Sequence, residues 1–222
     1  MPAARPLHPD NVPPRDRLTP TPGVSRLAPS LILTLSAEET IYRQDQPVGF
    51  LYEVVIGLVR TVRLAADGRR TVQAFFVPGD VFGLEHGERH LCSAEAVGET
   101  RVARCERRAL ESRALGEEAA ARTLWSWMTL AAERAQARLV WAGAVEKVSA
   151  FLVEMAERTA ADRRLDLAMS RYDIADYLGL SSETVSRTFT ALRHHGVIAI
   201  NGRTIHLLRP DELRRLSSAR AH

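Results

Sequence analysis

The stretch AMSRYDIADYLGLSSETVSRTFTALRHHGVIAINGRTIHLL, residues 168–208, carries the strongest structural signal in the chain. Ser170 and Asp173 have the Ser-x-x-Asp spacing of a capping box, which predicts that a helix begins near Arg171. Gly179 follows the apolar residues of this helix, at a point where the chain has to turn sharply. A residue without Cβ adopts a positive φ at little cost, so we expect the first helix to end there.

A second helix is predicted directly after the turn, with Ser181 or Ser182 as its N-cap. The spacing of Ala175, Gly179 and Val185 suits two helices that cross at a steep angle. Alanine permits the close approach, glycine permits the turn, and valine fills the shared core. The residues expected to face inward on the two helices are Ile174, Ala175, Leu178, Val185, Phe189 and Leu192.

Two short apolar runs follow the second helix, which we expect to end at Gly196. The runs VIAI (197–200) and TIHLL (204–208) flank the dipeptide Asn-Gly at 201–202. Asn-Gly between alternating apolar runs is the strongest short signal for a β-hairpin. Two crossed helices and this hairpin together predict a winged helix-turn-helix.

The winged unit is predicted to occupy residues 144–222, opening with the amphipathic helix VEKVSAFLVEMAERTA. A proline-free helical segment over residues 116–143 precedes it. Five residues of this segment are spaced 4-3-4-7, close to a heptad seam: Leu124, Met128, Ala131, Ala135 and Ala142. One interpretation is a helix packed on its own domain. We favour a dimerisation helix, because the stripe continues for more turns than a small β domain can cover.

The N-terminal half has the pattern of a β domain. Over residues 31–115, short β-branched and aromatic runs alternate with turn residues, and ADGR (66–69) is a hairpin signal. Closely spaced strands without helical patterns between them predict a small antiparallel roll or sandwich. Residues 1–30 hold eight of the 11 prolines and are expected to form a flexible arm. The predicted fold class is α+β.

The composition is that of a globular protein of 222 residues, with room for two modest domains. Thirty basic residues against 27 acidic ones give a net charge of +3, which permits a polyanionic partner. Two cysteines, Cys92 and Cys105, are too few for a disulfide framework, and we expect both to pack as small apolar residues in strands. No apolar run approaches the ~20 residues of a membrane span, so we expect a cytoplasmic protein.

The outward face of the second helix carries the residues that point to DNA. In a major groove, arginine can bond a guanine bidentately, glutamate can accept from the amine of cytosine, and serine allows close approach. The alternative is a simple i,i+4 ion pair between Glu183 and Arg187, worth about 0.2–0.5 kcal/mol. We favour base recognition by Glu183, Ser186 and Arg187, because an ion pair alone does not explain their place on the outward helix.

Other polar residues of this unit are expected to contact phosphates, which positions a protein on DNA without conveying sequence information. These residues are Arg171, Ser182, Thr184, Thr188 and Arg203. His194 and His195 lie near the end of the second helix, where a cation also favours the helix dipole, so both interpretations stay open for them.

Over residues 30–216 the chain resembles the cyclic-AMP receptor protein and FNR (CRP/FNR) superfamily of bacterial transcription regulators, which have a β-roll of the cyclic-nucleotide-binding type. ETVSR at 183–187 looks like the FNR-type motif Glu-x-x-Ser-Arg. The resemblance implies that Glu183, Ser186 and Arg187 recognise TTGA-type half-sites in an inverted repeat. The stretches at 171–193, VFGLE and SAEA are most similar to the FixK branch, activators of low-oxygen respiration and nitrogen-fixation genes.

The chain departs from this family where ligands are held. Cyclic-nucleotide-binding members carry an arginine before Ser/Thr-Ala, and here Cys92 precedes Ser93 and Ala94. A cyclic phosphate would lose its charge-assisted partner, and Glu85 and Arg89 could replace it only by rearrangement. FNR needs four cysteine ligands for its cluster, which two cysteines cannot supply within one chain. We therefore expect no cofactor.

The stretch from Glu85 to His90 also carries residue types that can bind a metal ion. Its candidate ligands are Glu85, His86, Glu88 and His90. We expect them to be solvated loop residues instead, because no other histidine or cysteine is placed to complete a set.

The sequence thus predicts a homodimeric activator, which is not an enzyme and binds double-stranded DNA at an inverted-repeat operator. The resemblance implies RNA polymerase as a second partner, contacted through exposed loops such as GLEHGER (83–89). An alternative keeps the fold but makes the roll a small-molecule or haem sensor, for nitric oxide or redox state. A third, an enzyme or scaffold that contains a winged helix, is disfavoured because the chain offers no nucleophile–base set and no phosphate-binding glycine loop.

Overall fold

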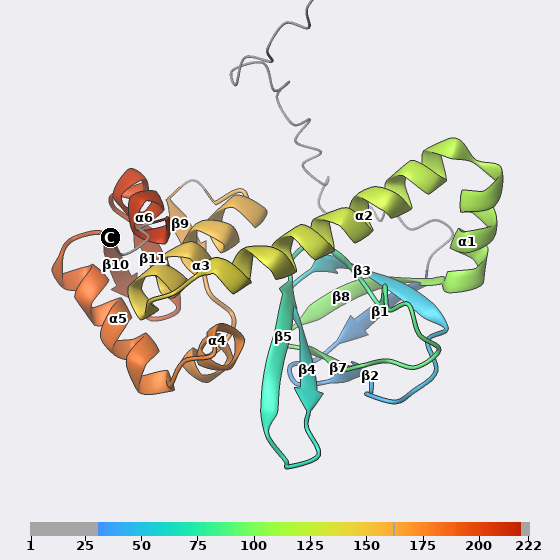
Figure 1. Ribbon diagram of the computed structural model, residues 1–222, viewed down its shortest axis with the longest axis horizontal. Helices are drawn as coiled ribbons and strands as arrows, with labels where there is room; N and C mark the ends of the chain where they lie inside the picture. Colours follow the sequence, from blue (N-terminus) through green and yellow to red (C-terminus); the bar gives the residue numbers. More distant parts are fainter. Residues whose placement is uncertain (1–30, 162, 219–222) are drawn as a thin grey trace, which may run out of the picture.

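A computed structural model describes residues 31–161 and 163–218 of the chain (Figure 1). The proline-rich arm predicted over residues 1–30 lies outside the described residues. A β-roll is followed by a long helix and then by a smaller unit of helices and a short sheet, so the predicted α+β class is confirmed. Among the described residues, no helix has both the length and the apolar character needed to cross a bilayer.

The roll consists of two antiparallel sheets within the described part of the chain, with strand orders β1-β8-β3-β6 and β2-β7-β4-β5. Its strands are β1 (Leu31–Leu35), β2 (Thr40–Tyr42), β3 (Phe50–Ile56), β4 (Val59–Leu64), β5 (Arg70–Phe76), β6 (Val81–Phe82), β7 (Ser93–Ala96) and β8 (Thr100–Glu106). The predicted hairpin at ADGR joins β4 to β5, and Gly68 takes the positive φ of 82° that the turn requires.

Three helical segments lead out of the roll, and Figure 1 shows the longest of them crossing over it. They are α1 (Arg107–Gly116), α2 (Glu118–Ala137) and the 3-10 turn η1 (Arg138–Val140). The helix predicted over 116–143 is thus too long, because Trp141 is extended, with ψ 121°, and packs against the core of the next unit. This stretch forms a joint between α2 and α3.

The C-terminal unit is a winged helix-turn-helix, as predicted. It contains α3 (Ala144–Arg158), β9 (Arg164–Asp166), α4 (Arg171–Leu178), α5 (Ser182–His194), β10 (Ile198–Asn201), β11 (Thr204–Leu207) and α6 (Pro210–Ser217). The capping box of Ser170 and Asp173 is present at the start of α4, and Gly179 ends that helix with φ 62°. The wing hairpin turns at Gly202, with φ 58°.

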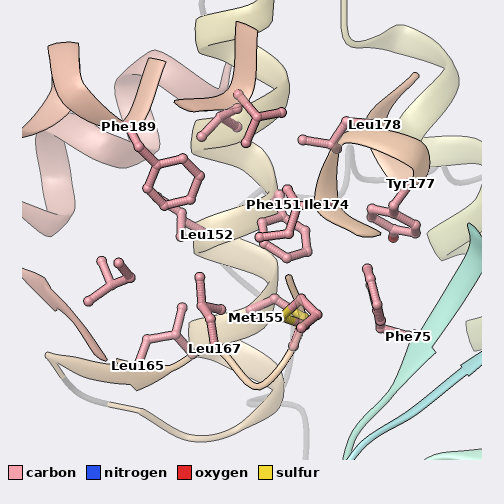
Figure 2. Packing of buried hydrophobic residues seen from close by; sticks show 14 of the residues in the cluster. Phe75, Phe151, Leu152, Met155, Leu165, Leu167, Ile174, Tyr177, Leu178 and Phe189 are labelled. Atoms are coloured by element: carbon pink, nitrogen blue, oxygen red, sulfur yellow. The ribbon is translucent and has the colours of Figure 1, made fainter. Parts of the chain in front are cut away.

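One apolar core runs from the roll into the C-terminal unit. Phe75 of β5 lies 5.1 Å from the ring of Tyr177 and 6.2 Å from the ring of Phe151, measured between centroids. Figure 2 shows this strand residue facing the side chains of α3 and α4. Val62 and Val72 of the roll belong to the same buried cluster. The helix-turn-helix is therefore packed against the β4–β5 hairpin and is not a free appendage.

Candidate DNA-binding surface

Helix α5 presents one apolar face inward and one polar face to solvent. Val185, Phe189 and Leu192 are buried, as the spacing predicts. Ser181, rather than Ser182, is the N-cap: its hydroxyl accepts from the backbone N–H of Thr184 at 3.0 Å. Figure 1 shows α5 on the side of the molecule away from the roll. The polar face is thus open to a large partner.

Glu183, Ser186 and Arg187 lie together on this polar face. The side chains of Glu183 and Arg187 are 71% and 80% exposed, and Arg187 Nη2 donates to Glu183 Oε1 at 2.5 Å. Ser186 is also exposed. The structure brings the three predicted base-reading residues onto one turn of helix, with Glu183 and Arg187 paired to each other.

The residues expected at phosphates occupy different environments. Ser182 is half-buried in the first turn of α5, and the hydroxyl of Thr184 lies 2.8 Å from that of Ser181. Thr188 was expected at the surface, but it is buried and its hydroxyl donates to the carbonyl of Thr184 at 2.8 Å. The reason is helical geometry, because position 188 shares a face with Val185 and Leu192. The hydroxyl of Thr188 is therefore not available for a phosphate contact.

Two arginines extend the basic surface beyond α5. The guanidinium of Arg171, in the first turn of α4, lies 3.5 Å from the ring centroid of Phe189. This cation–π contact packs α4 against α5. Arg203 is exposed in the turn of the wing, and its Nε donates to the carbonyl of Leu167 at 3.3 Å. Arg171 is thus held against α5, and Arg203 against the loop that precedes α4.

Four of the five residues of the predicted seam are exposed. Met128, Ala131, Ala135 and Ala142 are exposed, but Leu124 packs with Trp127 against the roll. Its neighbour Trp125 is 73% exposed, and Leu139 is 84% exposed. Exposed apolar residues of α2 and η1 also follow a 3-4-3-4 heptad spacing: Trp125, Met128, Ala132, Ala135 and Leu139.

The interior of the roll is filled by aromatic rings. The ring centroid of Tyr42 lies 3.6 Å from that of His90 and 5.5 Å from that of Tyr52, and Tyr52 stacks on Phe82 at 5.2 Å. His90 is only 2% exposed, and its Nδ1 lies 3.1 Å from Glu85 Oε1. The expectation of solvated side chains holds for His86 and Glu88 but is wrong for His90 and for Glu85, whose side chain is 13% exposed. His90 is buried because the loop folds back through paired backbone bonds to Asp45 and Gln46.

The potential metal ligands of the described residues do not gather at one place. Within residues 31–161 and 163–218, no group of three histidine, cysteine or acidic side chains is placed to hold a metal ion.

The two cysteines lie in different environments. Cys105 is buried in β8 as expected, whereas Cys92 is partly buried in the bend before β7. Burial, reinforced by the charge of Glu85, raises the pKa of the Cys92 thiol to about 11.

Sequence reasoning missed the ion pairs between the roll and the C-terminal unit. Arg60 of β4 and Arg70 of β5 bind Asp173 of α4, with N–O distances of 3.1 Å each. Asp80 binds Arg134 of α2 and Arg158 of α3, at 2.7 Å each. The partners in these pairs lie 54 to 113 residues apart in the chain, so no local pattern signals them.

Comparison with known proteins decides the family. A family model described as "Crp-like helix-turn-helix domain" matches residues 146–216, and one described as "Cyclic nucleotide-binding domain" matches residues 32–114. The chain is 42% identical over 192 residues to "Nitrogen fixation regulation protein FixK" of Rhizobium meliloti, covering 85% of this chain and 88% of that protein. The chain belongs to the CRP/FNR family of transcription regulators.

Further relatives within the CRP/FNR family agree. FixK of Azorhizobium caulinodans is 43% identical over 187 residues, which cover 80% of this chain and 75% of that protein. The structure of FixK2 from Bradyrhizobium japonicum matches with a TM-score of 0.81 and 40% identity, over 86% of this chain and 99% of that one. The predicted resemblance to FixK is confirmed, and the family is one of DNA-binding regulators rather than enzymes.

Proposed function

We propose that this CRP/FNR protein is a FixK-like activator of low-oxygen respiration or nitrogen-fixation genes, acting in the cytoplasm as a homodimer on a TTGA-type palindrome. The observation that carries the proposal is the exposed trio Glu183, Ser186 and Arg187 on the outward face of a capped and buried α5. The similarity to three proteins named for regulation of nitrogen fixation supports the choice of genes.

The chemistry of the trio suits base edges in a major groove. The Arg187 guanidinium can donate two parallel hydrogen bonds to O6 and N7 of a guanine, and the Glu183 carboxylate can accept from the N4 amine of a cytosine. Ser186 adds little bulk between them, so the helix can approach closely. The ion pair between Glu183 and Arg187 holds both side chains over the same turn of α5.

A palindrome requires a symmetric dimer, and α2 offers the surface for it. Trp125, Met128 and Leu139 form an exposed apolar stripe that would be costly to leave in water. Pairing of two such stripes buries them and places one α5 on each side of the two-fold axis. Half-sites about one helical turn apart follow from that symmetry.

The roll does not fit a cyclic nucleotide. Tyr42, Tyr52 and Phe82 lie in ring contact between the two sheets, and Cys92 stands where the family pattern has a phosphate-binding arginine. The hydroxyl of Ser93 accepts from the backbone N–H of Gln44 at 3.0 Å, so it is engaged within the roll. We infer that operator binding needs neither cyclic nucleotide nor an iron–sulfur cluster.

Activation also requires contact with RNA polymerase, for which we propose the loop GLEHGER (83–89). His86 and Glu88 of this loop are exposed on the roll. Replacing both by alanine should reduce transcription from a target promoter in vitro while operator binding stays unchanged. Equal loss of both activities would argue against this surface.

The function is tested with fluorescent duplexes at a stated salt concentration. Purified protein should bind a TTGA–TCAA inverted repeat at least about 10³-fold more tightly than a scrambled duplex. Addition of cyclic AMP should leave that affinity unchanged. Binding to the palindrome only at the level of scrambled DNA would refute the proposal, and a strong requirement for an added small molecule or haem would favour a sensor.

Arg187→Ala gives the residue-level test, and the chain offers a matched control. Arg122 on α2 is also exposed and also pairs with a glutamate one turn earlier, Glu118. Arg187→Ala should weaken palindrome binding by about 1–3 kcal/mol, whereas Arg122→Ala should not. Equal effects of the two substitutions would mean that Arg187 acts only through general charge.

A further inference from the structure

Three parts of the molecule meet at one buried carboxylate, Asp80, in the turn between β5 and β6. Its Oδ1 accepts from Arg134 Nη1 of α2 and its Oδ2 from Arg158 Nη2 of α3, each at 2.7 Å. The backbone N–H of Val77 donates to Oδ2 at 2.8 Å and fixes the carboxylate in the roll. Asp80, Arg134 and Arg158 are called the Asp80 cluster below.

The Asp80 cluster bridges the joint between α2 and α3. That joint consists of a 3-10 turn and the extended residue Trp141, so the helical hydrogen bonds do not continue through it. Arg134 lies before the joint and Arg158 lies after it. Because both arginines bind Asp80, this residue fixes the positions of α2 and α3 relative to the roll. The side chains of Asp80 and Arg158 are 9% and 8% exposed. Removing either one would leave the other as a buried charge without its partner, which strongly destabilises a protein.

A second ion cluster joins α4 to the roll. Arg60 Nη1 and Arg70 Nη2 each donate to Asp173 at 3.1 Å, and Arg70 Nη1 donates to Asp176 at 2.9 Å. Arg60 is held in turn by Glu38 and Glu95 of the roll. These residues, Arg60, Arg70, Asp173 and Asp176, are called the Asp173 cluster.

The two clusters restrict the orientation of the helix-turn-helix in different directions. The Asp173 cluster joins α4 to the β4–β5 hairpin, and the Asp80 cluster joins α3 to α2 and the start of β6. Phe75 packs on Phe151 and Tyr177 in the core between them. A rotation of the C-terminal unit would separate buried charges from their partners, which is unfavourable without water to replace them.

We propose that the two clusters position the helix-turn-helix for operator binding, by holding it at one orientation relative to α2. In a dimer paired through α2, that orientation fixes the distance between the two α5 helices and therefore the half-site spacing that the protein accepts. The inference rests on the proposed function as a homodimeric operator-binding protein. Asp80 and Asp173 are then positioning residues, which act on DNA through the placement of α5.

The test uses Arg134→Gln and Arg70→Gln, singly and together, in the full-length dimer. Both arginines are partly exposed, and each substitution leaves the buried aspartate with another arginine partner, Arg158 or Arg60. The probes are TTGA–TCAA inverted repeats with the best spacer, with one base pair more and with one base pair fewer, and a scrambled duplex. Thermal unfolding and dimer mass are measured for each variant.

Wild-type protein should strongly prefer one spacer. The double variant should lose about tenfold in affinity for that spacer and about as much in discrimination between spacers, while binding to scrambled DNA stays unchanged. Arg134→Lys and Arg70→Lys, which keep a charge near each aspartate, should restore much of the discrimination. The matched control is Arg69→Gln, because Arg69 is the exposed neighbour of Arg70 and, within residues 31–161 and 163–218, its ion pair is a local one with Asp67.

Failure of the positioning role and failure of the proposed function give different results in this experiment. Full spacer discrimination in a folded, dimeric double variant would overturn it, as would an equal loss on every duplex. If wild-type protein does not distinguish the palindrome from scrambled DNA, the proposed function fails and the positioning role fails with it.

Discussion

Arg187 Nη2 lies 2.5 Å from Glu183 Oε1 across one turn of α5, and both side chains are largely exposed to solvent. An exposed i,i+4 pair of this kind contributes only about 0.2–0.5 kcal/mol to folding. Its removal should therefore be nearly silent in stability measurements. If substituting either residue greatly weakens DNA binding, the loss must therefore arise in the complex with DNA. Substitutions at this pair can thus separate an effect on DNA recognition from an effect on folding.

Glu183→Gln is expected to relax selectivity at one base pair of each half-site. The amide keeps the size of the side chain but presents an NH₂ group and loses the charge that favours the amine of cytosine. Binding to the preferred palindrome should weaken by about 1–3 kcal/mol relative to wild-type protein. On duplexes altered at that base pair, the difference in affinity between wild-type protein and the variant should be smaller. Competition titrations with single-base-pair variants of the operator measure this.

Urea unfolding provides the control for Glu183→Gln. The free energy of unfolding should change by less than about 0.5 kcal/mol. A uniform loss of affinity on all duplexes, or clear destabilisation of the protein, would contradict base recognition by Glu183.

Arg203→Gln is expected to behave differently, because a phosphate contact carries no sequence information. Affinity should fall by a similar factor for the palindrome and for scrambled DNA. The slope of log affinity against log salt should become shallower by about 1, corresponding to one released counterion. Binding titrations at several salt concentrations check this, and a loss limited to one base pair would assign Arg203 to base recognition instead.

The neighbours Leu124 and Trp125 should have opposite roles, although they differ by one position in sequence. Leu124 packs beside Trp127 in the buried cluster under α2, whereas Trp125 points away from the roll. Trp125→Ala should shift dimers toward monomers with little change in the unfolding of the monomer. Leu124→Ala should destabilise the fold by about 2 kcal/mol and leave the dimer constant largely unchanged.

Sedimentation equilibrium and urea unfolding together test the two residues. Leu115→Ala on α1, at an exposed leucine away from the stripe, serves as the control and should alter neither quantity. If the dimer survives Trp125→Ala but is lost with Leu124→Ala, the dimer interface contains Leu124, as expected from the sequence, and not Trp125.

Local chemistry explains which features of the C-terminal unit could be predicted. The capping box at Ser170 and the turns at Gly179 and Gly202 depend on residues within four positions of one another, so the sequence contains the whole signal. The apolar face of α5 follows from helical periodicity in the same way. The trio Glu183, Ser186 and Arg187, which we propose reads bases, could be singled out because it lies opposite that face.

Features that depend on tertiary packing could not be predicted. The register of the α2 stripe is ambiguous, because in an alanine-rich helix two adjacent stripes look equally apolar until the roll is known to cover one of them. The burial of His90 depends on a loop that folds back on Tyr42. The Asp80 and Asp173 clusters join residues distant in the chain, and only the packed structure places them together.

Cys92 is expected to react slowly with alkylating reagents. Burial and the charge of Glu85 raise the pKa of its thiol to about 11, so at pH 8 only about one molecule in a thousand carries the thiolate. Alkylation by iodoacetamide should accelerate roughly tenfold for each pH unit between pH 7 and 9. Mass spectrometry of proteolytic peptides assigns the reaction to Cys92 or Cys105, and urea-unfolded protein supplies the unperturbed rate. Fast alkylation of folded protein at pH 7 would contradict the buried environment.

Asp80→Asn should destabilise the protein, because Arg134 and Arg158 would lose their shared anionic partner. The expected loss is about 3 kcal/mol near pH 7, measured by urea unfolding. Burial alone would raise the pKa of Asp80, but the guanidiniums of Arg158 and Arg134 outweigh it and hold the pKa below its ordinary value.

The sign of the pH dependence follows from that lowered pKa. A carboxyl with a lower pKa in the folded state adds stability at pH values above its unfolded pKa, about 3.9, and loses it as the pH falls through the folded value. The gap in unfolding free energy between wild-type protein and Asp80→Asn should therefore be constant from pH 7 to about 5 and narrow below about pH 4. Asp67→Asn is the control, since Asp67 pairs with Arg69 on the exposed β4–β5 turn and should cost far less stability. A gap that persists unchanged well below pH 3, or one that widens on acidification, would show that Asp80 does not stabilise the fold as a carboxylate paired with the two arginines.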